Sequence, residues 1–179
     1  MQIIGISGLP GSGKSIVAEK GLEKGATIVS MGDIIRNEAK KRGEATKTTA
    51  IKLRQEFGDC IVAELTIKEI KNIIENGFNG LIIVEGIRSY HEVKVFKENF
   101  ENFKIVSVFA NPEIRFKRIQ DRNRADDSQD IQLFNQRDQR ELNFGIGKVI
   151  SLSDKMIINE SSLDSFVTEI EEFYKKLGI

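Results

Sequence analysis

The chain is poor in residues that form covalent or metal-bound cross-links: its 179 residues include one cysteine, one histidine and no tryptophan. Cys60 has no second cysteine with which to form an internal disulfide, and the apolar residues 61–63 beside it predict a buried thiol rather than a nucleophile. His91 has no second histidine for a metal site and no recognisable serine partner. The sequence therefore excludes a disulfide-stabilised domain and gives no support to cysteine or histidine catalysis.

An excess of one charge and long hydrophobic runs are also lacking. The 27 basic and 27 acidic side chains cancel, so the chain has no overall electrostatic attraction to nucleic acid or to anionic lipid. Met1 leads directly into strand-like sequence, with no signal peptide and no apolar run long enough to span a membrane. We therefore expect a soluble, cytoplasmic protein whose partners are small molecules rather than nucleic acids or membranes.

Only two prolines are present, and no repeat or low-complexity linker divides the chain. With 40% hydrophobic content, residues 1–179 are sufficient for one domain with a layered core. Short apolar runs alternate with helical patterns, which predicts an α/β fold with a five-stranded parallel sheet. The predicted strands are 3–7, 27–30, 81–84, 105–110 and 156–158. Two segments are longer than an ordinary crossover: we expect 31–80 to form a helical acceptor-binding lobe, and the arginine-rich 118–141 to form a lid.

The chain does contain a glycine-rich phosphate-binding motif, directly after its first predicted strand. Residues 8–15 match the P-loop pattern G-x-x-x-x-G-K-S/T. Glycine permits the backbone angles that turn successive N–H groups towards a phosphate, and the helix that follows directs the positive end of its dipole at the same anion. Lys14 is expected to reach the β- and γ-phosphates of ATP, and Ser15 to hold Mg²⁺. The predicted cofactor-binding residues of the loop are Gly8, Pro10, Gly11, Ser12, Gly13, Lys14 and Ser15.

Charged residues follow the second and third predicted strands. Glu85 ends an apolar strand at the place where P-loop proteins hold a second Mg²⁺ ligand, although the usual acid there is aspartate. Arg36 follows the second strand and Arg88 the third, so both are predicted to lie at the edge of the sheet that carries the P-loop. The two guanidinium groups are expected to converge on one anionic acceptor; surface salt bridges are the alternative.

A cluster of arginines follows the fourth predicted strand. It comprises Arg118, Arg122 and Arg124, with Arg137 and Arg140 further along the chain. An arginine-rich lid would close over the γ-phosphate and neutralise the charge that develops during transfer, whereas a solvated charged helix is the usual alternative. Four neighbouring acids either hold these arginines by ion pairing or solvate the helix. They are Asp126, Asp127, Asp138 and Glu141.

Together, these motifs resemble those of the adenylate kinase and nucleoside monophosphate kinase superfamily over residues 3–165. Segment 31–36 is similar to the family's Ser-Thr-Gly-Asp-x-x-Arg motif, and 85–88 resembles its Asp-Gly-Phe-Pro-Arg motif without the proline. The resemblance implies a three-layer P-loop NTPase fold with a helical NMP-binding lobe, a short lid, and ATP and Mg²⁺ as cofactors. It implies that the acceptor is bound by Gly32, Asp33, Arg36, Gly86 and Arg88. It also implies that Arg118 stacks on the adenine of ATP and that Arg122, Arg124 and Arg137 contact phosphate.

The departures from this pattern leave the acceptor open. Arg122 and Arg124 are nearly adjacent, so the long lid insert of large adenylate kinases and its four-ligand metal site are absent. Segment 154–160 is similar to the last strand of dephospho-coenzyme A kinases, and 137–147 resembles a stretch of small archaeal adenylate-kinase-related proteins. Three functions are compatible with the sequence. They are transfer of the ATP γ-phosphoryl group to a nucleoside monophosphate, with AMP as the leading acceptor; a hydroxyl kinase in which Asp33 accepts the proton; and a nucleotide-responsive ATPase or switch.

Overall fold

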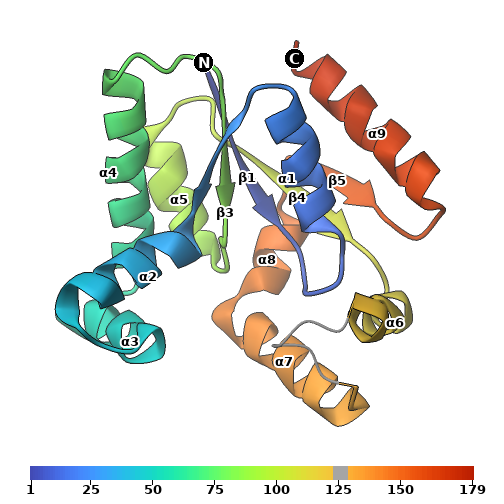
Figure 1. The fold of residues 1–179 in the computed structure, drawn as a ribbon, viewed down its shortest axis with the longest axis horizontal. Helices are drawn as coiled ribbons and strands as arrows, with labels where there is room; N and C mark the ends of the chain where they lie inside the picture. Colours follow the sequence, from blue (N-terminus) through green and yellow to red (C-terminus); the bar gives the residue numbers. More distant parts are fainter. Residues whose placement is uncertain (123–128) are drawn as a thin grey trace.

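The computed structural model describes residues 1–122 and 129–179, and it confirms the predicted five-stranded parallel sheet (Figure 1). The strands are β1 (Gln2–Ser7), β2 (Thr27–Ser30), β3 (Leu81–Glu85), β4 (Lys104–Phe109) and β5 (Lys155–Ile158). They lie in the order β2-β3-β1-β4-β5, and every neighbouring pair is parallel. The last residue of each strand lies within one position of the predicted last residue. The prediction succeeds because strands covered on both faces are continuously apolar.

Helices cover both faces of the sheet and so form three layers (Figure 1). One face is covered by α4 (Ile61–Glu75), α5 (Tyr90–Asn99) and α8 (Ile146–Ser151), and the other by α1 (Lys14–Glu23) and α9 (Leu163–Lys176). Four further helices lie around the carboxyl ends of the strands. They are α2 (Met31–Arg42), α3 (Thr46–Phe57), α6 (Pro112–Arg122) and α7 (Ile131–Phe144).

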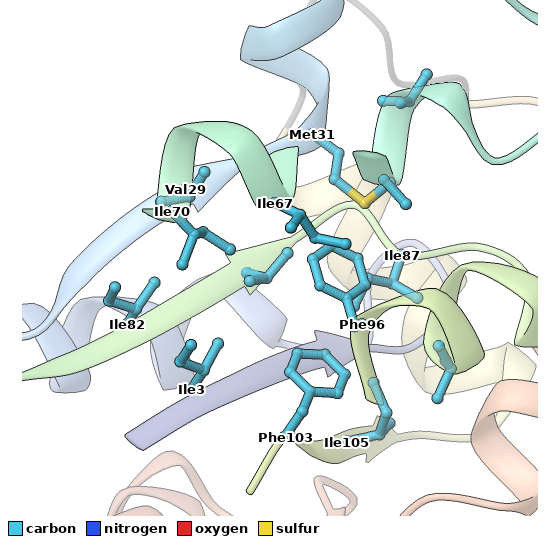
Figure 2. Packing of buried hydrophobic residues seen from close by; sticks show 14 of the residues in the cluster. Ile3, Val29, Met31, Ile67, Ile70, Ile82, Ile87, Phe96, Phe103 and Ile105 are labelled. Carbon is cyan, nitrogen blue, oxygen red and sulfur yellow. The ribbon is translucent and has the colours of Figure 1, made fainter. Parts of the chain in front are cut away.

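The hydrophobic core of the described residues consists of one cluster on each face of the sheet. On the α4 and α5 face, Ile3, Ile82 and Ile105 of three neighbouring strands pack with Ile70 of α4 and Phe96 of α5 (Figure 2). The opposite face has its own cluster, in which residues of β1, β3, β4 and β5 pack against α1 and α9. Because both faces of the sheet are packed in this way, the loops that leave its carboxyl ends start from a rigid base.

The two long segments predicted from the sequence have different structures. Segment 31–80 is helical over most of its length, as expected, and contains α2, α3 and α4. Segment 118–141 includes the end of α6 and most of α7, and residues 123–128 between these helices lie outside the described part. Cys60 precedes α4 and is only partly buried, so the expectation of a core thiol is wrong. Among the described helices, none combines the length and the apolar character that a membrane span requires.

Candidate functional site

The P-loop connects β1 to α1 at the carboxyl end of the sheet (Figure 1). Gly13 has a left-handed backbone, with φ of 102°, and caps α1, so Lys14 and Ser15 lie in the first turn of the helix. The loop also passes close to β4, since a Cβ on Gly8 would lie 2.4 Å from the carbonyl oxygen of Val108. Any other residue at Gly8 would therefore displace the loop from the sheet.

Lys14 is held by the loop that it follows. Its Nζ donates hydrogen bonds to the carbonyl oxygens of Gly8 (2.7 Å) and Leu9 (3.1 Å). Burial lowers the pKa of Lys14 to about 8, and the nearby carboxylates of Glu141 and Glu85 partly oppose this effect. The ammonium group thus lies in a desolvated setting, where its interaction with an anion is strengthened.

The strand register places Glu85 at the same edge of the sheet. The residue lies at the end of β3, opposite Ser30 of β2 on one side and Ile6 of β1 on the other. Burial raises the pKa of the Glu85 carboxyl, while the charge of Lys14 lowers it. Ser15 is exposed on the first turn of α1 and lines the same cleft as Glu85.

This cleft has a volume of about 550 Å³, which is in the size range of small-ligand sites. Among the described residues, five cationic side chains and two carboxylates line it. The cations are Lys14, Arg88, Arg118, Arg122 and Arg137, and the carboxylates are Glu85 and Glu141. The other predicted site residues in its lining are Gly8, Pro10, Gly11, Gly13, Ser15 and Gly86. The predicted lid residue Arg124 lies outside the described residues. The excess of positive charge suits a polyanionic ligand.

The predicted acceptor residues are divided between two places. Arg88 lines the cleft, where its Nε lies 3.3 Å from Glu141 Oε2 and its guanidinium lies over the Phe144 ring. Arg36 instead donates from Nε to Asp33 Oδ1 at 2.9 Å, on the exposed first turns of α2. Gly32, Asp33 and Arg36 are not among the described residues that line the P-loop cleft. The convergence of Arg36 and Arg88 on one ligand therefore stays a prediction.

A larger cleft, of about 930 Å³, lies between α2 and α4. Asp33 and Lys41 of α2 and Lys68 of α4 are among the charged residues that line it. No P-loop residue is among the described residues that line it. Cation placement rather than volume therefore identifies the smaller cleft as the candidate site.

Comparisons with known proteins show the family of the chain. A protein-family model described as an AAA domain matches residues 7–134, which include the P-loop. A UPF0200 protein of Methanothermobacter thermautotrophicus is 42% identical over 178 residues, covering 99% of this chain and 92% of the relative. A UPF0200 protein of Pyrococcus furiosus is 42% identical over 177 residues, covering 95% and 94%. The chain belongs to the UPF0200 family. The predicted P-loop nucleotide-binding domain is confirmed by the family model.

Solved structures show the fold of this UPF0200 chain in two other proteins. TT1252 from Thermus thermophilus superposes with a TM-score of 0.70 at 16% identity, covering 98% of this chain and 97% of the other. Shikimate kinase from Bacteroides thetaiotaomicron superposes with a TM-score of 0.57 at 14% identity, covering 99% of both chains. At these identities the comparison shows the fold alone, which is a P-loop NTPase-like α/β fold.

The sequence did not indicate Asn159, which braces the P-loop of the UPF0200 chain. This buried residue follows β5 and donates from Nδ2 to the carbonyl oxygen of Ser12 at 2.9 Å. Arg118 donates to both Asn159 oxygens, from Nη1 to the carbonyl at 3.0 Å and from Nη2 to Oδ1 at 3.1 Å. Burial lowers the pKa of the Arg118 guanidinium. The one sequence signal for this loop was the similarity of segment 154–160 to the last strand of dephospho-coenzyme A kinases.

Asp138 and Glu141 of α7 each form an ion pair, but with an arginine outside the cluster that the sequence analysis expected them to hold. Asp138 pairs with Arg115, a buried residue of α6 that the sequence did not single out. Glu141 pairs with Arg88. Arg115 and Arg88 both lie outside the predicted lid segment 118–141. The two ion pairs therefore hold α7 against α6 and against the loop that follows β3. Asp126 and Asp127 lie outside the described residues.

Proposed function

We propose that this protein is a nucleotide kinase that transfers the γ-phosphoryl group of Mg·ATP to a nucleoside monophosphate, with AMP as the leading acceptor. The proposal is supported by the five described cations that surround one P-loop cleft. Phosphoryl transfer needs little covalent chemistry from the protein, but it needs positive charge around the transferred group and a clamp on each anionic ligand. Arg88 comes from the β3 side and the other arginines from α6 and α7, which suits two anionic ligands held end to end.

Each cation has a proposed role. Lys14 exchanges its two loop carbonyls for the β- and γ-phosphates of ATP. Arg122 and Arg137 neutralise the charge on the transferred group, and Arg124 is proposed to join them when the lid closes. Arg118 covers the adenine, and Arg88 exchanges Glu141 for the phosphate of the acceptor. Because that phosphate is already an anionic nucleophile, the reaction needs clamping arginines rather than a general base.

The residues at the cleft fit a magnesium ion. The Ser15 hydroxyl and the Glu85 carboxylate are oxygen donors, which Mg²⁺ prefers, and both line the cleft beside Lys14. Ser15 and Glu85 would hold the ion, Glu85 directly or through water. When bound, the ion would supply charge neutralisation between the β- and γ-phosphates.

The experiment that tests this function measures ADP release from Mg·ATP with AMP, GMP, CMP, UMP or dephospho-coenzyme A as acceptor, with the products separated by chromatography. ADP formation that depends on a nucleoside monophosphate, together with the phosphorylated product, supports the proposal. Activity on dephospho-coenzyme A alone would identify a hydroxyl kinase and contradict it. Nucleotide binding without acceptor-dependent turnover would contradict it in favour of an ATPase or switch.

The acceptor assignment predicts a difference between two ligands. Arg88→Ala and Arg36→Ala are expected to weaken AMP binding by at least about tenfold, because a charge-assisted hydrogen bond to phosphate is lost, and to change ATP binding by less than about threefold. Calorimetry with each nucleotide measures both constants. Arg140→Ala is the matched control, since Arg140 is an exposed arginine of α7 outside the described lining of the cleft. Equal losses for AMP and ATP would contradict the assignment.

The lowered pKa of Lys14 predicts that nucleotide affinity depends on pH. Burial holds this pKa at about 8 in the protein alone, whereas bound phosphates favour the charged form. Above this pKa the protein must take up a proton when the nucleotide binds, so affinity falls as pH rises. Between about pH 7 and about pH 9 the affinity for Mg·ATP is expected to fall about tenfold. Calorimetry at both values tests this, and Lys14→Met is expected to remove the dependence. A pH-independent affinity in the native protein would refute it.

A further inference from the structure

Arg115 is the most deeply buried charged side chain in the described part of the molecule, with 1% of its surface exposed. Its guanidinium donates to the carbonyl oxygens of Ala110 (3.0 Å) and Pro10 (3.1 Å). Both terminal nitrogens also donate to the Asp138 carboxylate, with Nη1 at 2.9 Å from Oδ1. The group lies over the Phe134 ring, 5.1 Å from its centre. All three nitrogens of the guanidinium therefore have partners.

These contacts join three elements. Arg115 belongs to α6, Pro10 to the P-loop, and Asp138 and Phe134 to α7. A buried guanidinium is costly unless its N–H groups are paired, and the planar fork of arginine satisfies two carboxylate oxygens at once, which lysine cannot do. The pairing therefore fixes the angle and the distance at which α7 lies against the P-loop.

Helix α7 also carries two residues of the P-loop cleft. Arg137 is the neighbour of Asp138 in the chain. Glu141 lies one helical turn after Arg137, on the same side of the helix. Both line the cleft, and both lie close enough to Lys14 to influence its charge. A small displacement of α7 would move both residues relative to a bound phosphate, and misplacement by about 1 Å can cost about 10²-fold in rate.

We propose that Arg115 is a positioning residue that transmits the conformation of the P-loop to α7 and thereby sets Arg137 against the transferred phosphate. A nucleotide that reshapes the loop at Pro10 moves the acceptor of one Arg115 hydrogen bond, and the Asp138 fork carries that movement to α7. The effect on turnover rests on the proposed kinase function, whereas the movement of α7 rests on nucleotide binding alone.

The experiment replaces the ion pair without leaving a buried charge. Arg115→Met combined with Asp138→Leu substitutes apolar side chains of similar size, a change that buried ion pairs often tolerate. The control, Lys24→Met with Glu171→Leu, removes an ion pair of 2.8 Å between the residue that follows α1 and a residue of α9. Because the chain has no tryptophan, Leu133→Trp provides a single reporter on α7, at a side chain that is 50% exposed. The probe is Mg²⁺ with the β,γ-imido analogue of ATP.

In the native and control backgrounds, binding of the analogue is expected to change the reporter fluorescence. In the Arg115/Asp138 double variant the analogue is expected to bind within about fivefold of the native affinity, without that change, and kcat is expected to fall at least about tenfold with little change in KM for ATP. A folded double variant that keeps the response and kcat would overturn the proposal, as would a native background in which bound analogue causes no response.

Two further outcomes are separable. If the double variant does not fold, Arg115→Lys retains the charge without the fork and is expected to lose the response as well; full retention would overturn the proposal. If the native protein phosphorylates no acceptor, the proposed kinase function fails, while the affinity and fluorescence measurements still decide the role of Arg115.

Discussion

Replacement of Lys14 by methionine is expected to reduce Mg·ATP turnover by at least about 10²-fold while the protein stays folded. Methionine retains the length of the side chain but removes the ammonium group that reaches the transferred phosphate. The fold is expected to persist because, in the described part of the chain, Lys14 donates only to the carbonyl oxygens of Gly8 and Leu9 in the P-loop and takes no part in the hydrophobic clusters of the sheet. Initial rates and circular dichroism measure the two effects separately.

The matched control for this variant is Lys20→Met. Lys20 lies on the same helix, α1, and pairs with Glu23 on its exposed side, where such a pair contributes at most about 1 kcal/mol. Turnover by the control is expected to equal that of the native protein. A Lys14→Met protein with full activity would end the P-loop mechanism proposed above.

Gly11→Ala is expected to weaken Mg·ATP binding by at least about tenfold, because it combines backbone strain with a collision. Gly11 has a φ of 81°, and a Cβ there would lie 2.8 Å from the carbonyl oxygen of Arg115 and 3.2 Å from its Cα. Backbone atoms of a packed helix cannot move aside as a flexible side chain can. The loop must therefore shift away from α6, which moves its N–H groups out of place. Calorimetry measures the affinity, and denaturant unfolding measures the stability.

Gly25→Ala is the matched control, because it introduces similar backbone strain without a steric collision. Gly25 has nearly the same φ, 83°, but an added Cβ would meet nothing within 4 Å. This variant is expected to lose about 1–2 kcal/mol of unfolding free energy, the cost of a left-handed alanine, and to bind nucleotide normally. If the two variants had the same nucleotide affinity, close packing of the loop on α6 would play no part in binding.

The features that the sequence predicted correctly are those carried by neighbouring residues. The P-loop motif is contiguous: its glycines lie between β1 and α1, and Lys14 and Ser15 begin α1. The strands were predictable because a sheet covered on both faces needs unbroken apolar runs. The position of Glu85 at the carboxyl edge follows from the same parallel register. In each case local composition and the geometry of a parallel sheet are sufficient.

Pairings between distant residues could not be predicted in this way. Arg115 looked like one arginine among several, and only its placement against Pro10 and Asp138 separates it from the exposed Arg140. Asn159 lies 147 positions from Ser12. Charge alone could not indicate which acid faces Arg88, because that depends on the angle at which α7 leaves the body of the protein.

The hydrogen bond between Ser12 and Asn159 has a consequence for synthesis of the chain. The side chain that braces the P-loop follows β5 and lies 147 positions after Ser12, and chains are made at about 5–20 residues per second. A nascent chain that ends before residue 159 lacks this brace. The P-loop therefore reaches its braced conformation only after β5 has been made, well after its own residues.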